Sequence, residues 1–340
     1  MPKKPKRSEG STLSPDVPPT PATPAGVPPI AFDVLQQVVL PIIAVARDGR
    51  WHPIGSAFVI AVDAPKRAFL LTAAHNLRAV LTIDRPHERR HLTMAPDFRP
   101  RAAEWADLAA TRVFVGFNRD GHMTLAEMVR GWFAEPLDVA LMVVEAPPEI
   151  NASLEQRLAL DSRPVLPGLP VFAAGYHTMT ADFAEPPDYE AQRFKVQFKF
   201  EIRTTRPGHV TSLCPQGTGI HHSPGFLVDF PFDPGMSGGP VIDLSGTEPL
   251  VRGVVGSDLS DGSEQGARGS DSRAFASTLW PAMMTQLTET RLEFPDGAVL
   301  GPNARLIDLV ARGFIDDRGQ AHDHVRSLQT EEGQRLWWET

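Results

Sequence analysis

Residues 233–241 read Asp-Pro-Gly-Met-Ser-Gly-Gly-Pro-Val and place Ser237 in the middle of a glycine-rich turn. A serine that attacks an acyl carbon needs backbone N–H groups aimed at the oxyanion that forms beside it. Glycines permit the tight turn, free of side chains, that points such groups at one place. We therefore interpret Ser237 as a candidate nucleophile, with an oxyanion hole formed by the backbone N–H groups of Gly235 and Ser237. A β-turn of a structural protein is the alternative.

Two further residues could complete such a site. His75 follows the apolar run 69–74 (FLLTAA), and Asp138 opens the almost wholly apolar run 139–144. A general base must be held rigidly within hydrogen-bond reach of the serine, and the end of a strand can do this. A carboxylate at the mouth of an apolar strand is costly to bury unless it is bonded, and the N–H of an imidazole is a suitable partner. Taken singly, His75 could be a structural histidine and Asp138 a turn or capping residue.

The rest of the chain, from residue 31, is dominated by short apolar and β-branched runs with turn residues between them, a pattern that predicts strands and an all-β pair of barrels or sandwiches. Asp120-Gly121 is a hairpin signal. The predicted strands are 38–45, 56–62, 68–73, 112–117, 139–144, 170–175, 194–202, 226–230, 240–244 and 250–255. Helical patterns occur at 102–110, 278–287, 304–311 and 324–338.

Composition excludes several classes of protein. The chain has 340 residues, 42% of them hydrophobic, so it can bury a large core. The net charge of −8 argues against a nucleic-acid partner for the folded part, and the longest apolar run is too short to span a membrane. Cys214 is the single cysteine and no export signal precedes it, so we expect a cytoplasmic protein. Residues 1–30 are proline-rich and are expected to be a disordered tail.

Taken together, these blocks resemble the trypsin-like serine peptidases, and they are most similar to the disulfide-free bacterial branch that includes the HtrA (DegP-like) proteases. The resemblance extends from about residue 38 to 287, with the blocks in matching order. The blocks are 55–60 (GSAFVI), 71–75 (LTAAH), 138–141 (DVAL), 171–176 (VFAAGY), 234–240 (PGMSGGP) and 252–256 (RGVVG).

The resemblance implies an all-β chymotrypsin-like fold of two six-stranded barrels, followed by a C-terminal helix and a short, partly helical extension. It places the protease domain at 31–289, with the first barrel at about 31–150 and the second at about 165–280. An insertion at 78–111 and the 290–340 extension have no assigned role, and no PDZ-like module follows the protease. Met236 stands where secreted members carry an aspartate.

The activity implied is that of a serine endopeptidase acting on protein or peptide substrates with a His75, Asp138 and Ser237 triad, and without metal or cofactor. The residues expected to bind substrate are Pro231, Val254, Val255, Gly256 and Ser257. Pro231 supplies no carboxylate to pair with arginine or lysine, and Phe230, Phe232 and Val255 are nearby, so we expect the cleaved residue to be small or medium and apolar. The alternative is that Asp258, just past Ser257, supplies the carboxylate.

Two alternatives remain. Residues 235–239 also fit the Gly-x-Ser-x-Gly elbow of α/β-hydrolase esterases, but that fold needs a helix directly after the serine and a histidine later in the chain. The other alternative is a catalytically weak or inactive protease-fold module that only binds its partners.

Overall fold

The structure is a computed structural model that describes most of the chain between residues 30 and 339. The described residues are 30, 32–46, 49–63, 67–83, 111–119, 122–133, 137–145, 156–183, 196–218, 221–258, 273–287, 292–293, 299–301, 304–330 and 333–339. The tail at 1–29, the helix predicted at 102–110 and most of the 78–111 insertion lie outside them.

The first barrel is closed by six strands in the order β1-β2-β3-β6-β5-β4. These strands are β1 (Val39–Val45), β2 (Trp51–Asp63), β3 (Arg67–Thr72), β4 (Arg112–Arg119), β5 (His122–Phe133) and β6 (Ala140–Glu145). Arg119 of β4 lies opposite His122 of β5, and the predicted hairpin signal Asp120-Gly121 lies outside the described residues.

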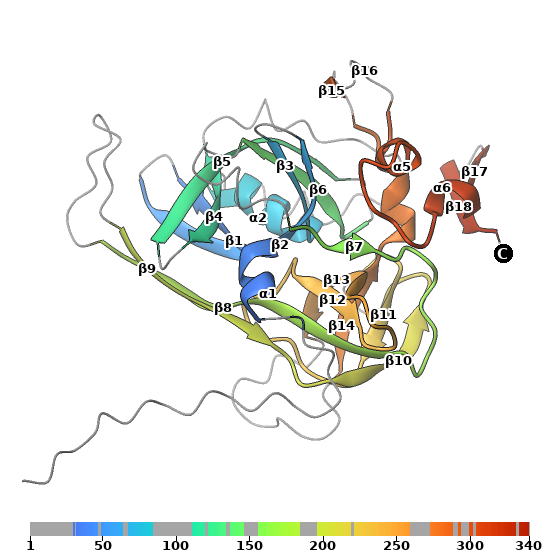
Figure 1. The fold of residues 1–340 in the computed structure, drawn as a ribbon, viewed down its shortest axis with the longest axis horizontal. Coiled ribbons are helices and arrows are strands. Elements are labelled where there is room, and N and C mark those ends of the chain that lie inside the picture. The colour runs from blue at the N-terminus through green and yellow to red at the C-terminus, as the bar shows by residue number, and fades with distance from the viewer. Residues whose placement is uncertain are drawn as a thin grey trace, which may run out of the picture.

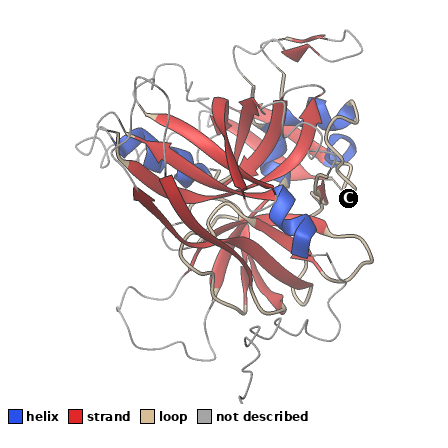
Figure 2. Cartoon of the chain, turned by 60° about the vertical axis from the view of Figure 1, so that its left-hand side comes forward, coloured by secondary structure: helices blue, strands red, loops and turns tan. Residues whose placement is uncertain are grey.

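The second barrel also closes through six strands, because β8 pairs with both β12 and β10 at the ends of the path β12-β13-β14-β11-β10 (Figure 1, Figure 2). Its strands are β8 (Pro170–Phe183), β10 (Gly208–Cys214), β11 (Gly225–Val228), β12 (Pro240–Asp243), β13 (Leu250–Asp258) and β14 (Ala274–Thr278). The far half of β8 pairs with β9 (Val196–Thr204), and β7 (Ala159–Leu160) lies parallel to β13. The all-β two-barrel prediction is confirmed.

Strands that are buried on both faces explain the continuous apolar runs of the sequence. In β3, Ala68 and Leu70 face the core of the first barrel, whereas Phe69 and Leu71 face a second core that both barrels share. β13 divides in the same way, with Val254 in the shared core and Val255 inside the second barrel. The two barrels are therefore packed together through a common hydrophobic layer.

Helices are few. They are α1 (Phe32–Val38), α2 (Ala74–Ile83), the 3₁₀ helix η3 (Trp280–Met284), α5 (Leu306–Ala311) and α6 (Ala321–His324). The C-terminal helix is shorter than predicted, because Thr278 ends strand β14 and Pro281 opens a single 3₁₀ turn. None of the described helices has the length and apolar character needed to cross a membrane.

The helix predicted at 324–338 is wrong, because the described residues from Val325 to Trp338 form a hairpin. It consists of β17 (Val325–Thr330) and β18 (Gly333–Trp338), and a second short hairpin pairs β15 (Leu292–Glu293) with β16 (Val299–Leu300). Val325 pairs with Trp338, and the ring of His324 stacks on Trp338 at 5.0 Å. Cross-strand contacts therefore override the local helical pattern.

The C-terminal segment packs against the barrels. Leu306, Leu309 and Val310 of α5 belong to the shared core, and Phe314 meets the ring of Phe69 edge-on at 4.9 Å. The buried carboxylate of Asp317 accepts hydrogen bonds from four groups, which are Ser162 N–H, Ser162 Oγ–H, Gly319 N–H and Ala321 N–H. This part of the extension thus contributes to the hydrophobic core that positions the site.

Candidate active site

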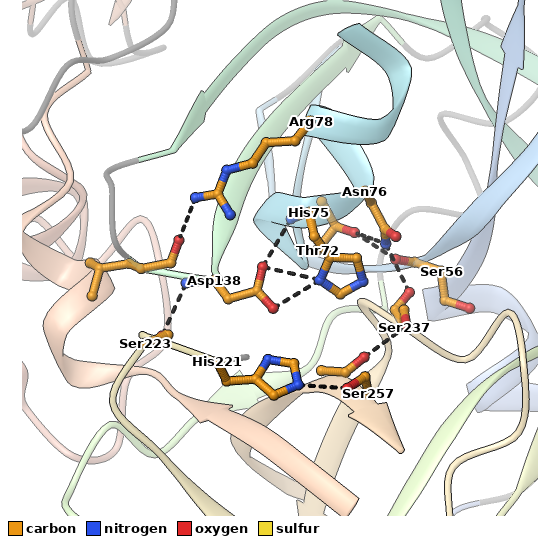
Figure 3. Close-up of polar contacts among 12 residues, drawn as sticks. Ser56, Thr72, His75, Asn76, Arg78, Asp138, His221, Ser223, Ser237 and Ser257 are labelled. Carbon is orange, nitrogen blue, oxygen red and sulfur yellow. Dashed lines mark hydrogen bonds and ion pairs between the residues drawn. The ribbon is translucent and has the colours of Figure 1, made fainter. Parts of the chain in front are cut away.

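The three candidate residues lie where elements of the two barrels meet (Figure 3). His75 sits in the first turn of α2, three residues after β3 ends, rather than on the strand itself. Asp138 lies just before β6, and Ser237 lies in the turn before β12. Residues far apart in sequence are thus brought to one edge of the inter-barrel contact.

His75 and Asp138 form a tight pair. The Nδ1 atom of His75 is 2.8 Å from Asp138 Oδ2 and 3.1 Å from Oδ1, and the backbone N–H of His75 donates to Oδ1 at 2.9 Å. The side chain of Asp138 is only 9% exposed. With Nδ1–H donating to the carboxylate, the ring presents Nε2 as a proton acceptor.

The electrostatic setting keeps Asp138 ionised. Burial alone would raise the pKa of Asp138, but the charge and hydrogen bonds of His75, together with the charge of Arg78, lower it below its ordinary value. The backbone N–H of Asp138 donates to Ser223 Oγ at 3.0 Å, which ties the residue to the second barrel.

Ser237 makes a different contact from the one the sequence predicts. Its Oγ–H donates to the carbonyl oxygen of Gly256 at 2.8 Å, and within the described residues it has no hydrogen bond to His75. Catalytic hydrogen bonds of this kind often tighten only when substrate is bound. The structure therefore brings His75 together with Asp138, whereas the Ser237 hydroxyl is hydrogen-bonded to Gly256 of β13.

The turn around Ser237 has the backbone that glycines permit. Gly235 has φ +92° and Gly238 has φ +88°, both in the left-handed region. Among the described residues, neither the N–H of Gly235 nor that of Ser237 donates a hydrogen bond, so both remain open to an acceptor. The side chain of Met236 is fully buried in the core of the second barrel, which holds the turn by packing.

Two polar residues of the first barrel clamp this turn, and the sequence analysis assigned neither of them a role. The backbone N–H of Ser56 and the Asn76 side-chain amide both donate to the carbonyl oxygen of Ser237, at 2.8 and 2.9 Å. Asn76 also donates to Thr72 Oγ1 at 3.0 Å, and Ser56 Oγ–H donates to the carbonyl oxygen of Gly235 at 2.9 Å. The sequence carries only a weak signal for Ser56 and Asn76, because each is simply a polar residue within an apolar block.

Replacing Asn76 by aspartate tests this clamp. The amide that donates two hydrogen bonds becomes a carboxylate facing the Ser237 carbonyl, at a site where residue 76 is 2% exposed. We expect the free energy of unfolding in urea to fall by about 3 kcal/mol. Asn118→Asp, on the exposed side of β4, is the matched control and should change it by less than about 0.5 kcal/mol. Equal losses in the two variants would contradict the clamp.

The residues expected to bind substrate differ in how deeply they are buried. Val254 and Val255 are fully buried, so only their backbones could meet a substrate, whereas Gly256 presents the carbonyl group that Ser237 contacts. Pro231 is half-buried, and its neighbours Phe230 and Phe232 point into the core of the second barrel. The apolar side chains behind the predicted preference therefore fill a core.

Comparison with known families decides the assignment. A model of the trypsin-like peptidase domain matches residues 55–251, which include His75, Asp138 and Ser237. The chain belongs to the trypsin-like peptidase family. In this trypsin-like peptidase a strand, β12, follows Ser237, where the esterase elbow would require a helix.

Solved structures that are similar to this trypsin-like peptidase include two forms of one bacterial protease. The active form of the Rv3671c protease from M. tuberculosis is 19% identical, with a TM-score of 0.41, and the match covers 80% of this chain and 89% of that one. A serine-to-alanine mutant of that protease in an inactive form is 18% identical, with a TM-score of 0.41 and coverage of 77% and 91%. None of the curated proteins matches this chain.

Among the described residues, no group of three or more His, Cys, Asp or Glu side chains is placed to hold a metal ion.

Proposed function

We propose that this trypsin-like peptidase is a serine endopeptidase, with Ser237 as nucleophile, His75 as general base and Asp138 as the residue that orients His75. The observation that carries the proposal is the His75–Asp138 pair, with Nδ1 and Oδ2 2.8 Å apart, beside a serine turn that has two open N–H groups. The pair leaves His75 Nε2 available to accept a proton from Ser237.

The proposed reaction has two stages, the acylation of Ser237 and its deacylation. Ser237 Oγ leaves the Gly256 carbonyl, gives its proton to His75 Nε2 and forms a bond to the scissile carbonyl carbon. The N–H groups of Gly235 and Ser237 stabilise the oxyanion, and His75 returns the proton to the departing amine as the C–N bond breaks. Water then gives a proton to His75 Nε2 and attacks the acyl carbon, and His75 returns that proton to Ser237 Oγ as the ester bond breaks and the acid product leaves. Asp138 remains ionised throughout and stabilises the imidazolium.

A non-catalytic binding module is the second candidate, and the hydrogen bond from Ser237 to Gly256 rather than to His75 favours it. Incubation of the full chain with an unfolded protein such as β-casein, followed by mass spectrometry of the products, separates the two. The endopeptidase proposal expects internal cleavage that EDTA leaves unchanged. Intact casein after prolonged incubation with correctly folded protein would favour the binding module.

A further inference from the structure

A second imidazole lies beside the candidate triad. His221, in the loop between β10 and β11, stacks its ring on Phe275 at 4.4 Å with an interplanar angle of 12°. Its Nε2 atom is 2.6 Å from Ser257 Oγ, and its backbone exchanges two hydrogen bonds with Thr218. The ring is therefore held by a stack, a side-chain hydrogen bond and its own turn.

The position of His221 connects it to the triad on two sides. Ser257 directly follows Gly256, whose carbonyl oxygen accepts from Ser237, and Ser223, two residues after His221, accepts from the backbone of Asp138. In Figure 3 the ring of His221 lies below Asp138 and His75, with its second nitrogen turned to their side. That atom, Nδ1, has no hydrogen-bond partner among the described residues and is not sealed from solvent.

The strand beneath this histidine has an edge on which a substrate could pair. β12 pairs with β13 only as far as Val254, opposite Pro240, so β12 does not cover the backbone of Gly256 and Ser257. An extended peptide that adds to this edge gains main-chain hydrogen bonds and places alternate side chains against the surface. A side chain that reaches past Ser257 toward the triad would meet the Nδ1 atom of His221, which is turned to the side of Asp138 and His75.

We propose that His221 and Ser257 form a specificity subsite that hydrogen-bonds an acceptor oxygen, from a carboxamide or carboxylate side chain of the substrate, on the acyl side of the scissile bond. The proposal rests on the proposed endopeptidase function. When the Ser257 hydroxyl donates to Nε2, the ring proton lies on Nδ1 and is donated to the substrate oxygen. An apolar side chain there would leave this N–H without a partner as water is displaced.

Burial and the charged groups near His221 determine whether it favours a carboxamide or a carboxylate at a given pH. Burial lowers the pKa of His221 below its ordinary value, Asp138 opposes that shift, and His75 and His222 add to it. The ring is thus a neutral donor at pH 8, which suits a carboxamide. A bound carboxylate raises the pKa of the ring, so binding of a glutamate side chain takes up a proton and strengthens as the pH falls toward 6.

Matched peptides test the subsite. Each has one scissile bond and carries Gln, Glu or the near-isosteric Met at one of the four positions before it. We expect one position at which kcat/KM for Gln exceeds that for Met by about 10-fold. In His221→Phe, which keeps the stack on Phe275, this ratio should fall to about one, while the exposed control His222→Phe keeps it. A wild-type ratio near one at all positions, or an unchanged ratio in His221→Phe, would overturn the proposal.

The pH dependence supplies a second readout. The Glu-to-Gln ratio of kcat/KM should rise as the pH is lowered from 8 to 6 in the wild type and stay flat in His221→Phe. The His221→Phe variant keeps the triad residues, so it is the reference against which the change in this ratio is compared. An equal pH dependence in the two proteins would place the effect at another group and contradict the subsite.

Binding measurements separate this subsite from the catalytic proposal. If no peptide is cleaved, the proposed function fails, but calorimetry on full-length Ser237→Ala still measures whether Gln peptides bind more tightly than Met peptides. Loss of that difference in the double variant Ser237→Ala/His221→Phe supports the subsite. Equal affinities of the two peptides for Ser237→Ala would refute it.

Discussion

Replacing Ser237 by alanine is expected to lower kcat for peptide hydrolysis by about 10⁶-fold, because the nucleophile of the first step is lost. The fold should survive, since the change removes one hydroxyl whose hydrogen bond goes to the Gly256 carbonyl. We expect the free energy of unfolding to change by about 1 kcal/mol. Steady-state kinetics on a fluorogenic peptide, with circular dichroism as the check on folding, measures both effects.

The matched control for that variant is Ser327→Ala, on the exposed side of the C-terminal hairpin. It removes the same hydroxyl far along the chain from the proposed machinery, and its kcat should remain within about two-fold of the wild type. Substantial cleavage by purified Ser237→Ala would assign the activity to a contaminant or to another nucleophile.

The second large effect is expected for Asp138→Asn, which should lower kcat by about 10⁴-fold. One side-chain oxygen of Asp138 accepts from the backbone N–H of His75 at 2.9 Å, and the other lies 2.8 Å from Nδ1. The asparagine oxygen would keep the backbone hydrogen bond, so its NH₂ group would face Nδ1 and donate to it. The ring proton then moves to Nε2, which can no longer accept the proton of Ser237.

The readout that identifies this tautomer effect is a loss confined to kcat, with KM changed by only a few-fold and the fold intact. Asp323→Asn, at an exposed position of α6, serves as the control for the same chemical change and should leave kcat unaltered. A variant Asp138→Asn that retains a tenth or more of wild-type kcat would show that Asp138 does not set the tautomer of His75.

How far the sequence predicts this fold depends on how each strand is buried. β3 and β6 are apolar on both faces because one face lines the first barrel and the other the shared core, and such runs are plain in the sequence. The barrel strands that the sequence analysis missed, β5, β10 and β14, are less distinct. β10 alternates buried and exposed residues along GHVTSLC, and β5 carries charged residues such as Glu127 and Arg130 on its exposed side.

The residues of the candidate site also differ in how clearly the sequence indicates them. Motifs locate His75, Asp138 and Ser237, because each sits in a block whose residue types its role requires. Asn76 and His221 carry no such signal, since their significance arises from contacts across the fold, as between Asn76 and Ser237, which are 161 residues apart. The direction in which Ser237 Oγ points is likewise a matter of tertiary geometry that no local pattern encodes.

Covalent labelling with a fluorophosphonate tests the central claim most directly, because phosphonylation requires an activated serine next to a working base and oxyanion hole. Intact-mass analysis followed by peptide mapping reads out both stoichiometry and position. The account predicts one adduct per chain, located on Ser237, absent in Ser237→Ala and formed much more slowly in Asp138→Asn. A folded wild-type protein that acquires no adduct, or acquires it on another serine, would contradict the account.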